Sequence, residues 1–169
     1  MPFKLISLTF FLFLSFLNVQ AQEKPKLVVG IVVDQMRYEY LHRFAVKYGN
    51  DGFKKLMEDG FNSRNTHYNY VPTYTAPGHS SIFTGTTPSV HGIISNDWYD
   101  KESDQYVYCV EDTLMSSVGA KNGKGISPQY LLTTTIADEL KLSTQFESKT
   151  IGISAKDRGA VLPVGKSAD

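Results

Sequence analysis

Three short stretches of the sequence carry polar residues that could bind and transfer an anionic group. Asp34 directly follows the apolar run 27–33, and a carboxylate at the end of a buried strand is a good ligand for a divalent cation. The same residue could instead cap a following helix. Thr75 stands two residues before Pro77, so its hydroxyl could lie in the first turn of a helix, among free backbone N–H groups that attract anions. Capping of that helix is the simpler interpretation of this threonine.

A threonine hydroxyl becomes a useful nucleophile only when a base or a metal removes its proton. A divalent cation bound by Asp34 would do this as a Lewis acid. Asp34 and Thr75 together therefore predict a metal-assisted attack on a phosphoryl or sulfuryl group, provided that the fold brings the two side chains together.

Three further residues could hold the oxygens of such a group. Asn96 could donate a hydrogen bond to a substrate oxygen, although loop asparagines more often form turns. Lys156 and Arg158 are separated by one residue and follow the apolar segment 150–154. In a loop both could face one anion, the arginine as a fork and the lysine as a point charge. Both could equally lie on the solvated surface.

The histidines and the cysteine do not form a recognisable metal-binding motif. None of the four histidines has an HxxxH spacing, and we expect His79 and His91 to form hydrogen bonds in the walls of the proposed site. The single cysteine, Cys109, cannot form an internal disulfide and is expected to be a small buried apolar residue.

Alternating strand and helix patterns would position these residues. The run 27–33 is rich in β-branched residues, which is typical of a central parallel strand buried on both faces. Further strands are expected at 61–70, 106–110 and 150–154, and helices at 38–48, 51–59, 76–84 and, from a Ser-Pro start signal, 127–140. This order predicts a layered α/β fold with a central, mostly parallel sheet and helices on both faces.

Residues 1–21 have the features of an export signal. Lys4 precedes the mostly apolar stretch 5–17, which is shorter than the roughly 20 residues of a membrane span. Val19 and Ala21 supply the small residues that precede a cleavage site. The mature chain would be 22–169, in the periplasm or outside the cell, with no stable membrane span. The balance of 17 basic and 17 acidic residues argues against a nucleic-acid partner.

Three motifs, in this order along the chain, point to one family: GIVVDQMRYEYL, THYNYVPTYTAPGHSSIFTGTTPSVHGIISNDWYD and SAKDRGAVLPVGKSAD. They resemble the N-terminal part of the PafA-type zinc alkaline phosphatases. These belong to the alkaline phosphatase superfamily, alongside the nucleotide pyrophosphatase/phosphodiesterases. The resemblance implies an alkaline-phosphatase-like fold in which Asp34 binds zinc and Thr75 is the nucleophile and also contacts zinc. It also implies that Asn96, Lys156 and Arg158 bind phosphoryl oxygens.

The function implied by the resemblance is hydrolysis of small phosphate monoesters with two Zn²⁺ ions, through a phosphothreonine at Thr75. The family's remaining zinc ligands, in an Asp-x-x-x-His motif, an Asp-His pair and a distant histidine, do not occur in this sequence. A zinc site takes three or four protein ligands. We therefore expect the chain to be an N-terminal fragment of the catalytic domain that is inactive by itself.

Two other functions fit parts of the sequence. A type I phosphodiesterase or nucleotide pyrophosphatase would share Asp34, Thr75 and Asn96. A diester carries one negative charge fewer, so a Lys/Arg pair favours the monoesterase. A sulfatase would need cysteine or serine in place of the threonine. A non-catalytic exported module could bind phosphate in the same pocket without metals.

Overall fold

The computed structural model describes residues 25–119 and 123–169. Contacts divide the chain into two units, Met1–Val32 and Val33–Asp169, and all five candidate site residues belong to the second. The predicted signal peptide lies outside the described residues. Among the residues described, no helix has both the length and the apolar character needed to cross a membrane.

The described part of the first unit is an exposed, extended segment. The predicted buried strand at 27–33 is wrong for this chain, because these residues form no strand and five of their six large apolar side chains, all but Val32, are 52–79% exposed. A strand requires hydrogen-bonded neighbours, and the described residues provide none here. The segment is apolar, as the sequence shows, but it does not pair with another strand among the described residues.

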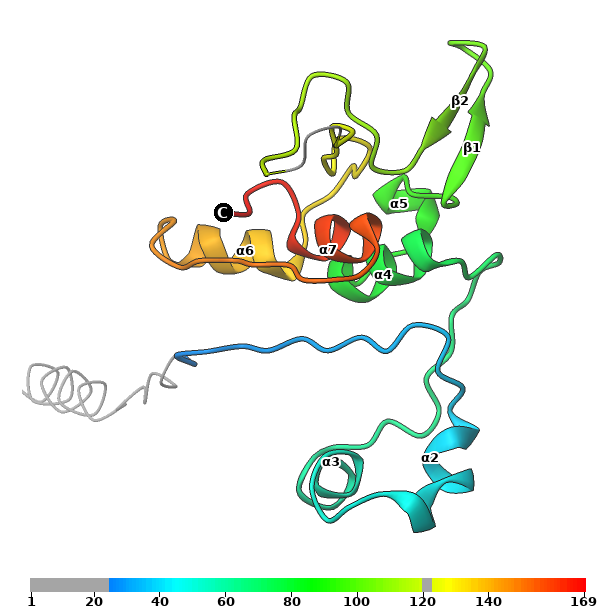
Figure 1. Cartoon of the computed structure of the whole chain (residues 1–169), viewed down its shortest axis with the longest axis vertical. Coiled ribbons are helices and arrows are strands. Elements are labelled where there is room, and N and C mark those ends of the chain that lie inside the picture. Colours follow the sequence, from blue (N-terminus) through cyan, green and yellow to red (C-terminus); the bar gives the residue numbers. More distant parts are fainter. Residues whose placement is uncertain (1–24, 120–122) are drawn as a thin grey trace, which may run out of the picture. The chain divides into compact units, whose positions relative to one another are not determined.

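Most of the regular secondary structure of the second unit is in short helices, which are labelled in Figure 1. The elements in chain order are α2 (Glu39–Arg43), η1 (Ala45–Lys47), α3 (Phe53–Asp59), α4 (Thr75–Thr84), α5 (Pro88–His91), β1 (Asp97–Asp100), β2 (Gln105–Tyr108), α6 (Ile136–Ser143) and α7 (Asp157–Val164). The predicted helices at 51–59 and 76–84 are confirmed as α3 and α4. The one predicted at 38–48 is divided between α2 and η1.

Helix α4 lies at the centre of the second unit. It packs against α5, α6 and α7, and residues 76–81 are all buried. Small side chains such as Ala76, Gly78 and Ser80 allow the neighbouring elements to approach closely. The helix ends at Gly85, whose φ of 67° is left-handed backbone that glycine adopts readily. The buried apolar core around α4 comprises Ala76, Ile93, Cys109, Val110, Leu131 and Leu162.

The described residues contain one sheet, an antiparallel hairpin. Strands β1 and β2 pair with Asp97 opposite Tyr108 and Asp100 opposite Gln105. The strand predicted at 106–110 is therefore confirmed, two residues short of its expected end. The segments 61–70 and 150–154 are not strands. Ile151 and Ile153 are 72% and 92% exposed, so this apolar segment lacks the neighbours that a buried strand requires.

Helix α6 begins later than the predicted start at Ser127. Its N-cap is Thr135, whose hydroxyl accepts from the backbone N–H of Asp138 while the Asp138 carboxylate accepts from the backbone N–H of Thr135. This reciprocal capping box satisfies two free donors of the first turn. The Ser127 hydroxyl instead donates to Asp112 at 2.5 Å. Helices α5 and α7 and strand β1 were not predicted, since each is four to eight residues long and gives little periodicity.

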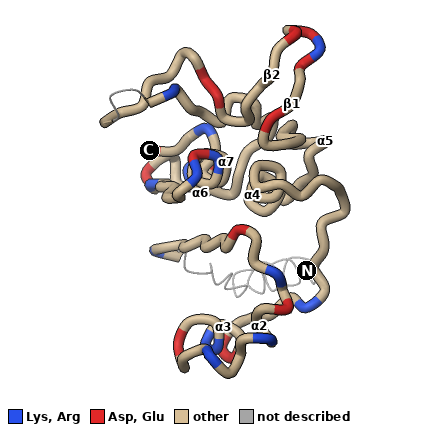
Figure 2. The backbone as a smooth tube through the Cα atoms, turned by 45° about the vertical axis from the view of Figure 1, so that its right-hand side comes forward, with Lys and Arg blue, Asp and Glu red and all other residues tan. Residues whose placement is uncertain are grey.

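Charged residues of both signs are interspersed along the tube in Figure 2. The chain carries 17 basic and 17 acidic residues, and no long run of one sign occurs in the sequence. Because the charges balance, the chain as a whole produces no electrostatic field that would attract an anion. A site for an anion must therefore depend on a few charged side chains that lie close together.

Candidate functional site

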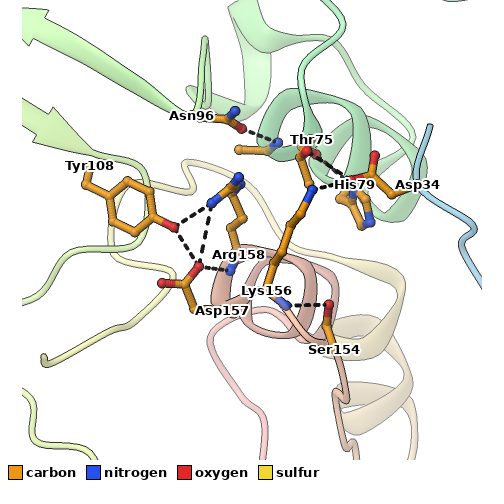
Figure 3. A network of polar contacts seen from close by, with 10 residues as sticks. Asp34, Thr75, His79, Asn96, Tyr108, Ser154, Lys156, Asp157 and Arg158 are labelled. Carbon is orange, nitrogen blue, oxygen red and sulfur yellow. Dashed lines mark hydrogen bonds and ion pairs between the residues drawn. The ribbon is translucent and has the colours of Figure 1, made fainter. Parts of the chain in front are cut away.

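Thr75 is the first residue of α4, and its hydroxyl is not used as a cap. The N-cap position belongs to Tyr74, in extended conformation, whose side chain makes no capping bond. The Thr75 hydroxyl instead donates to Asp34 Oδ2 at 3.1 Å (Figure 3). The interpretation of Thr75 as a simple cap is therefore wrong. The first turn of the helix places this hydroxyl at the positive end of the helix dipole, facing a carboxylate.

Asp34 connects the first turns of two helices. Its Oδ2 atom accepts from Thr75 at the start of α4 and from Lys156 Nζ, at 2.8 Å, at the start of α7. The hydrogen bond from Lys156 lowers the pKa of Asp34, burial opposes this, and the bond from Thr75 lowers the pKa further. Asp34 does not cap α2, whose N-cap is Tyr38. An ionised carboxylate with one exposed edge remains for a cation.

Lys156 and Arg158 lie at the N-terminus of α7, where the sequence predicted a loop. Lys156 is the N-cap residue and Arg158 is the second residue of the helix. The first turn of α7 contacts α4, since a Cβ added at Gly159 would lie 3.9 Å from Nε2 of His79, a residue of α4. The same Cβ would lie 2.6 Å from Oγ of Ser154, in the segment before α7. The side chain of Arg158 is 20% exposed, whereas that of Lys156 is 45% exposed. The arginine is thus the more rigidly held cation of the pair.

Asn96 directly precedes β1 and contacts the first turn of α4. Its Oδ1 atom accepts from the backbone N–H of Ala76 at 3.0 Å (Figure 3). Because the carboxamide oxygen is occupied in this way, the amide NH₂ group is the part available to donate to a ligand. The structure therefore brings Asp34, Thr75 and Lys156 into one hydrogen-bonded cluster. Asn96 lies beside this cluster, bonded to Ala76, the residue that follows Thr75.

Three neighbours of these residues extend the polar cluster. His79 lies one turn along α4, and its Nδ1–H donates to the Thr75 carbonyl at 2.8 Å, which agrees with the wall position expected for it. Tyr108 and Asp157, which bond to each other and to Arg158, were not singled out from the sequence. The sequence showed only that Asp157 directly precedes Arg158.

Two oxygen atoms of the described residues have the chemistry of metal ligands. No group of three or more His, Cys, Asp or Glu side chains gathers anywhere in the described ranges. Asp34 and the Thr75 hydroxyl provide two oxygen ligands, which suit a hard or borderline divalent cation such as zinc. These two donors fit a metal but do not complete its coordination shell.

The arrangement defines a class of site. A threonine hydroxyl, a carboxylate and a lysine ammonium meet where two helices begin, and Arg158 lies in the first turn of the second helix, bonded to Tyr108. Such an arrangement is typical of a site that binds an anion. Residues 28–153 match the type I phosphodiesterase / nucleotide pyrophosphatase family, and since this match covers well over half of the chain, the chain belongs to that family.

The chain is similar to proteins described as alkaline phosphatases. It is 52% identical over 151 residues to alkaline phosphatase PhoV of Synechococcus elongatus, a match that covers 89% of this chain and 28% of PhoV. The crystal structure of wild-type alkaline phosphatase PafA matches with a TM-score of 0.83 and 52% identity, over 86% of this chain and 28% of PafA. A PafA variant with substitutions of one threonine, one asparagine, one lysine and one arginine gives the same TM-score at 49% identity.

These matches confirm the predicted α/β fold class. The chain spans a little over a quarter of the length of the relatives it matches, which agrees with the small amount of sheet in the described residues.

Proposed function

We propose that this chain supplies the nucleophile and phosphate-binding part of a metal-dependent phosphate monoester hydrolase of the alkaline phosphatase type. The observation that carries the proposal is the meeting of the Thr75 hydroxyl and the Lys156 ammonium on Asp34 Oδ2, at the starts of α4 and α7. The similarity to PhoV and PafA over nearly the whole of this chain supports it.

In the proposed reaction, the Thr75 hydroxyl loses its proton to solvent, and Oγ1 attacks the phosphorus atom of the monoester in line with the leaving group. The Oγ1–P bond forms, the ester P–O bond breaks, and the alcohol leaves with a proton from solvent. Water then attacks the phosphothreonine, the Oγ1–P bond breaks, and inorganic phosphate is released with the Thr75 hydroxyl restored. The positive end of the α4 helix dipole would stabilise the negative charge during both steps.

The other residues of the cluster bind the dianion. Lys156 and Arg158 would contact the non-bridging oxygens, and the Asn96 NH₂ group would donate to one of them. The PafA variant provides support, because it has the same four residue types substituted in the same order along its chain. Asp34 and Thr75 would hold Zn²⁺, which would lower the pKa of the nucleophile and stabilise charge on the transferred group.

Two further parts of the proposal concern location and substrate. We infer that residues 1–21 direct export to the periplasm or the medium, on the strength of the short apolar stretch after Lys4. We also infer that the partners are small phosphate esters, because Lys156 and Arg158 offer positive charge for a phosphoryl group.

A type I phosphodiesterase activity is the second candidate, favoured by the description of the matched family. The two activities differ in the charge of the reacting group. A monoester dianion gains more from two cations than a diester monoanion does, so Lys156 and Arg158 favour the monoesterase.

The complete protein encoded by the reading frame that contains this chain tests the proposal. We expect release of nitrophenol from p-nitrophenyl phosphate to exceed that from bis-p-nitrophenyl phosphate, to stop with EDTA and to return with Zn²⁺. Acid quenching should trap phosphate on the peptide that contains Thr75. A preference for the diester would favour the second candidate. Phosphate binding without turnover and without an effect of EDTA would indicate a non-catalytic phosphate-binding module.

A further inference from the structure

The guanidinium group of Arg158 is held by a hydrogen bond at Nη1, whereas its Nε has no hydrogen-bond partner among the described residues. Its Nη1 atom donates to the Tyr108 hydroxyl at 2.8 Å, and its Cζ atom lies 5.9 Å from the centroid of the tyrosine ring. Nε is buried and has no hydrogen-bond partner among the described residues. A buried donor without an acceptor is costly, and a charged guanidinium binds phosphate most strongly through two adjacent N–H groups. Nε therefore needs an acceptor that the described residues do not supply, and an anion bound at this edge of the guanidinium would provide one.

The tyrosine that holds Arg158 is itself oriented. Its hydroxyl donates to Asp157 Oδ1 at 2.5 Å, and the same carboxylate oxygen accepts from the backbone N–H of Arg158 at 2.7 Å (Figure 3). Because the single phenolic proton points to Asp157, a lone pair of the oxygen faces Nη1. Burial and the bond to Asp157 raise the pKa of Tyr108 to about 12, so the phenol stays neutral at any moderate pH.

The β1–β2 hairpin places Tyr108 beside another residue of the site. Tyr108 is the last residue of β2 and pairs with Asp97, the first residue of β1. The next residue, Cys109, donates its backbone N–H to the carbonyl of Asn96 at 3.0 Å. The base of the hairpin thus fixes the phenol of Tyr108 and the amide of Asn96 together, from opposite strands. The helix α7 supplies the two residues that the phenol contacts.

We propose that Tyr108, oriented by Asp157, is a positioning residue that presets Arg158 for a phosphate dianion and so favours monoesters over diesters. The inference rests on the proposed function and deepens it. Tyr108 acts through Arg158 and does not contact substrate. The hydroxyl is what matters, since the phenyl ring would remain in a Tyr108→Phe variant.

The test compares Tyr108→Phe with Tyr106→Phe in the complete protein. Tyr106 lies on the same strand, is 79% exposed, and is the matched control. We expect Tyr108→Phe to lower kcat/KM for p-nitrophenyl phosphate about tenfold, the loss expected for one hydrogen bond to a charged group. The loss for bis-p-nitrophenyl phosphate should be under about threefold, since the diester gains less from Arg158. The Tyr106→Phe protein should match the unsubstituted protein with both substrates.

A double-mutant cycle separates positioning from general support. In an Arg158→Ala background, Tyr108→Phe should have no further effect, because the group that it positions is gone. A second variant, Asp157→Asn, should give a smaller loss in the same direction. A Tyr108→Phe loss that equals the control, or that persists in the Arg158→Ala background, would overturn the inference.

The outcome is readable even if the proposed function fails. If the unsubstituted protein releases no phosphate, calorimetric binding of inorganic phosphate replaces activity as the measurement. Weaker phosphate binding by Tyr108→Phe than by Tyr106→Phe would then uphold the positioning role without the hydrolase. Equal binding by the two variants, or no binding by the unsubstituted protein, would reject it.

Discussion

Thr75 and Thr135 both lie at the start of a helix, and they are used differently. Thr135 is buried and is the N-cap of α6, with both its hydroxyl and its backbone N–H bonded to Asp138. Thr75 lies one position further into its helix, α4, and its hydroxyl bonds to Asp34, 41 residues away in the sequence. In α6 the polar groups of the first turn satisfy one another. In α4 they bond to residues outside the helix, the Thr75 hydroxyl to Asp34 and the Ala76 N–H to Asn96.

Helix α4 is held by a network through its middle and, at its start, by the Asn96 side chain, which accepts from the Ala76 N–H. The Ser81 hydroxyl contacts His91 Nε2 at 3.0 Å and donates to the Tyr70 hydroxyl at 2.7 Å, which donates to the Pro77 carbonyl at 3.0 Å. Since these bonds and burial hold the helix, the Thr75 hydroxyl is not needed as a cap. The comparison teaches that a threonine whose helix is held by other residues is a better candidate nucleophile than one that caps its own helix.

Alanine substitution of the two threonines should separate activity from stability most strongly. Thr75→Ala removes the proposed nucleophile, so we expect kcat/KM of the complete protein to fall by about a thousandfold or more, with little change in the thermal midpoint. Thr135→Ala removes a cap, which costs about 1 kcal/mol of stability, and should leave the activity of the folded protein unchanged. Phosphate release and thermal melting of both variants measure the contrast. Equal activity losses would contradict it.

The glycines that end α7 and α4, Gly165 and Gly85, offer a second contrast between crowded and open positions. Gly165 has a φ of 72°, and a Cβ there would lie 2.0 Å from Asp138 Oδ2. Gly85, the C-cap of α4, has a similar φ of 67° but no atom within 4 Å of its added Cβ. Both alanine variants incur the backbone cost of about 1 kcal/mol, and Gly165→Ala should lose about 1–3 kcal/mol more through the collision. Denaturant midpoints that agree within error would show that the carboxylate moves away freely.

The smallest expected effect concerns the network that supports α4. Burial lowers the pKa of His91 below its ordinary value of 6.5, opposed by a backbone hydrogen bond. As the pH falls through 6.5, the unfolded chain takes up this proton before the folded chain does, so stability falls with the pH. We expect the thermal midpoint to drop by about 2 °C more between pH 7 and pH 5 than in a His91→Gln variant. His42→Gln, at an exposed position, should behave as the unsubstituted protein does.

The accuracy of the sequence predictions depended on how local each feature is. Helices α3 and α4 have their apolar spacing and their terminal glycines within ten residues or so, and both were predicted. The start of α6 was missed although Thr135 and Asp138 show the capping-box spacing, because the Ser127-Pro128 signal was preferred. The segments 27–33 and 150–154 are apolar enough for strands. Strand formation depends on neighbours, which the described residues do not provide.

The sequence by itself determined which residue types were available: a threonine near a helix start, a carboxylate after an apolar run, and a Lys/Arg pair. It could not decide whether Thr75 is a cap or Lys156 a solvated surface residue, because both alternatives obey the same local rules. The tertiary structure decided, by placing Asp34 against residues 41 and 122 positions away. It alone revealed Tyr108 as the partner of Arg158, 50 residues apart, because a hydrogen bond between distant segments leaves no local pattern in the sequence.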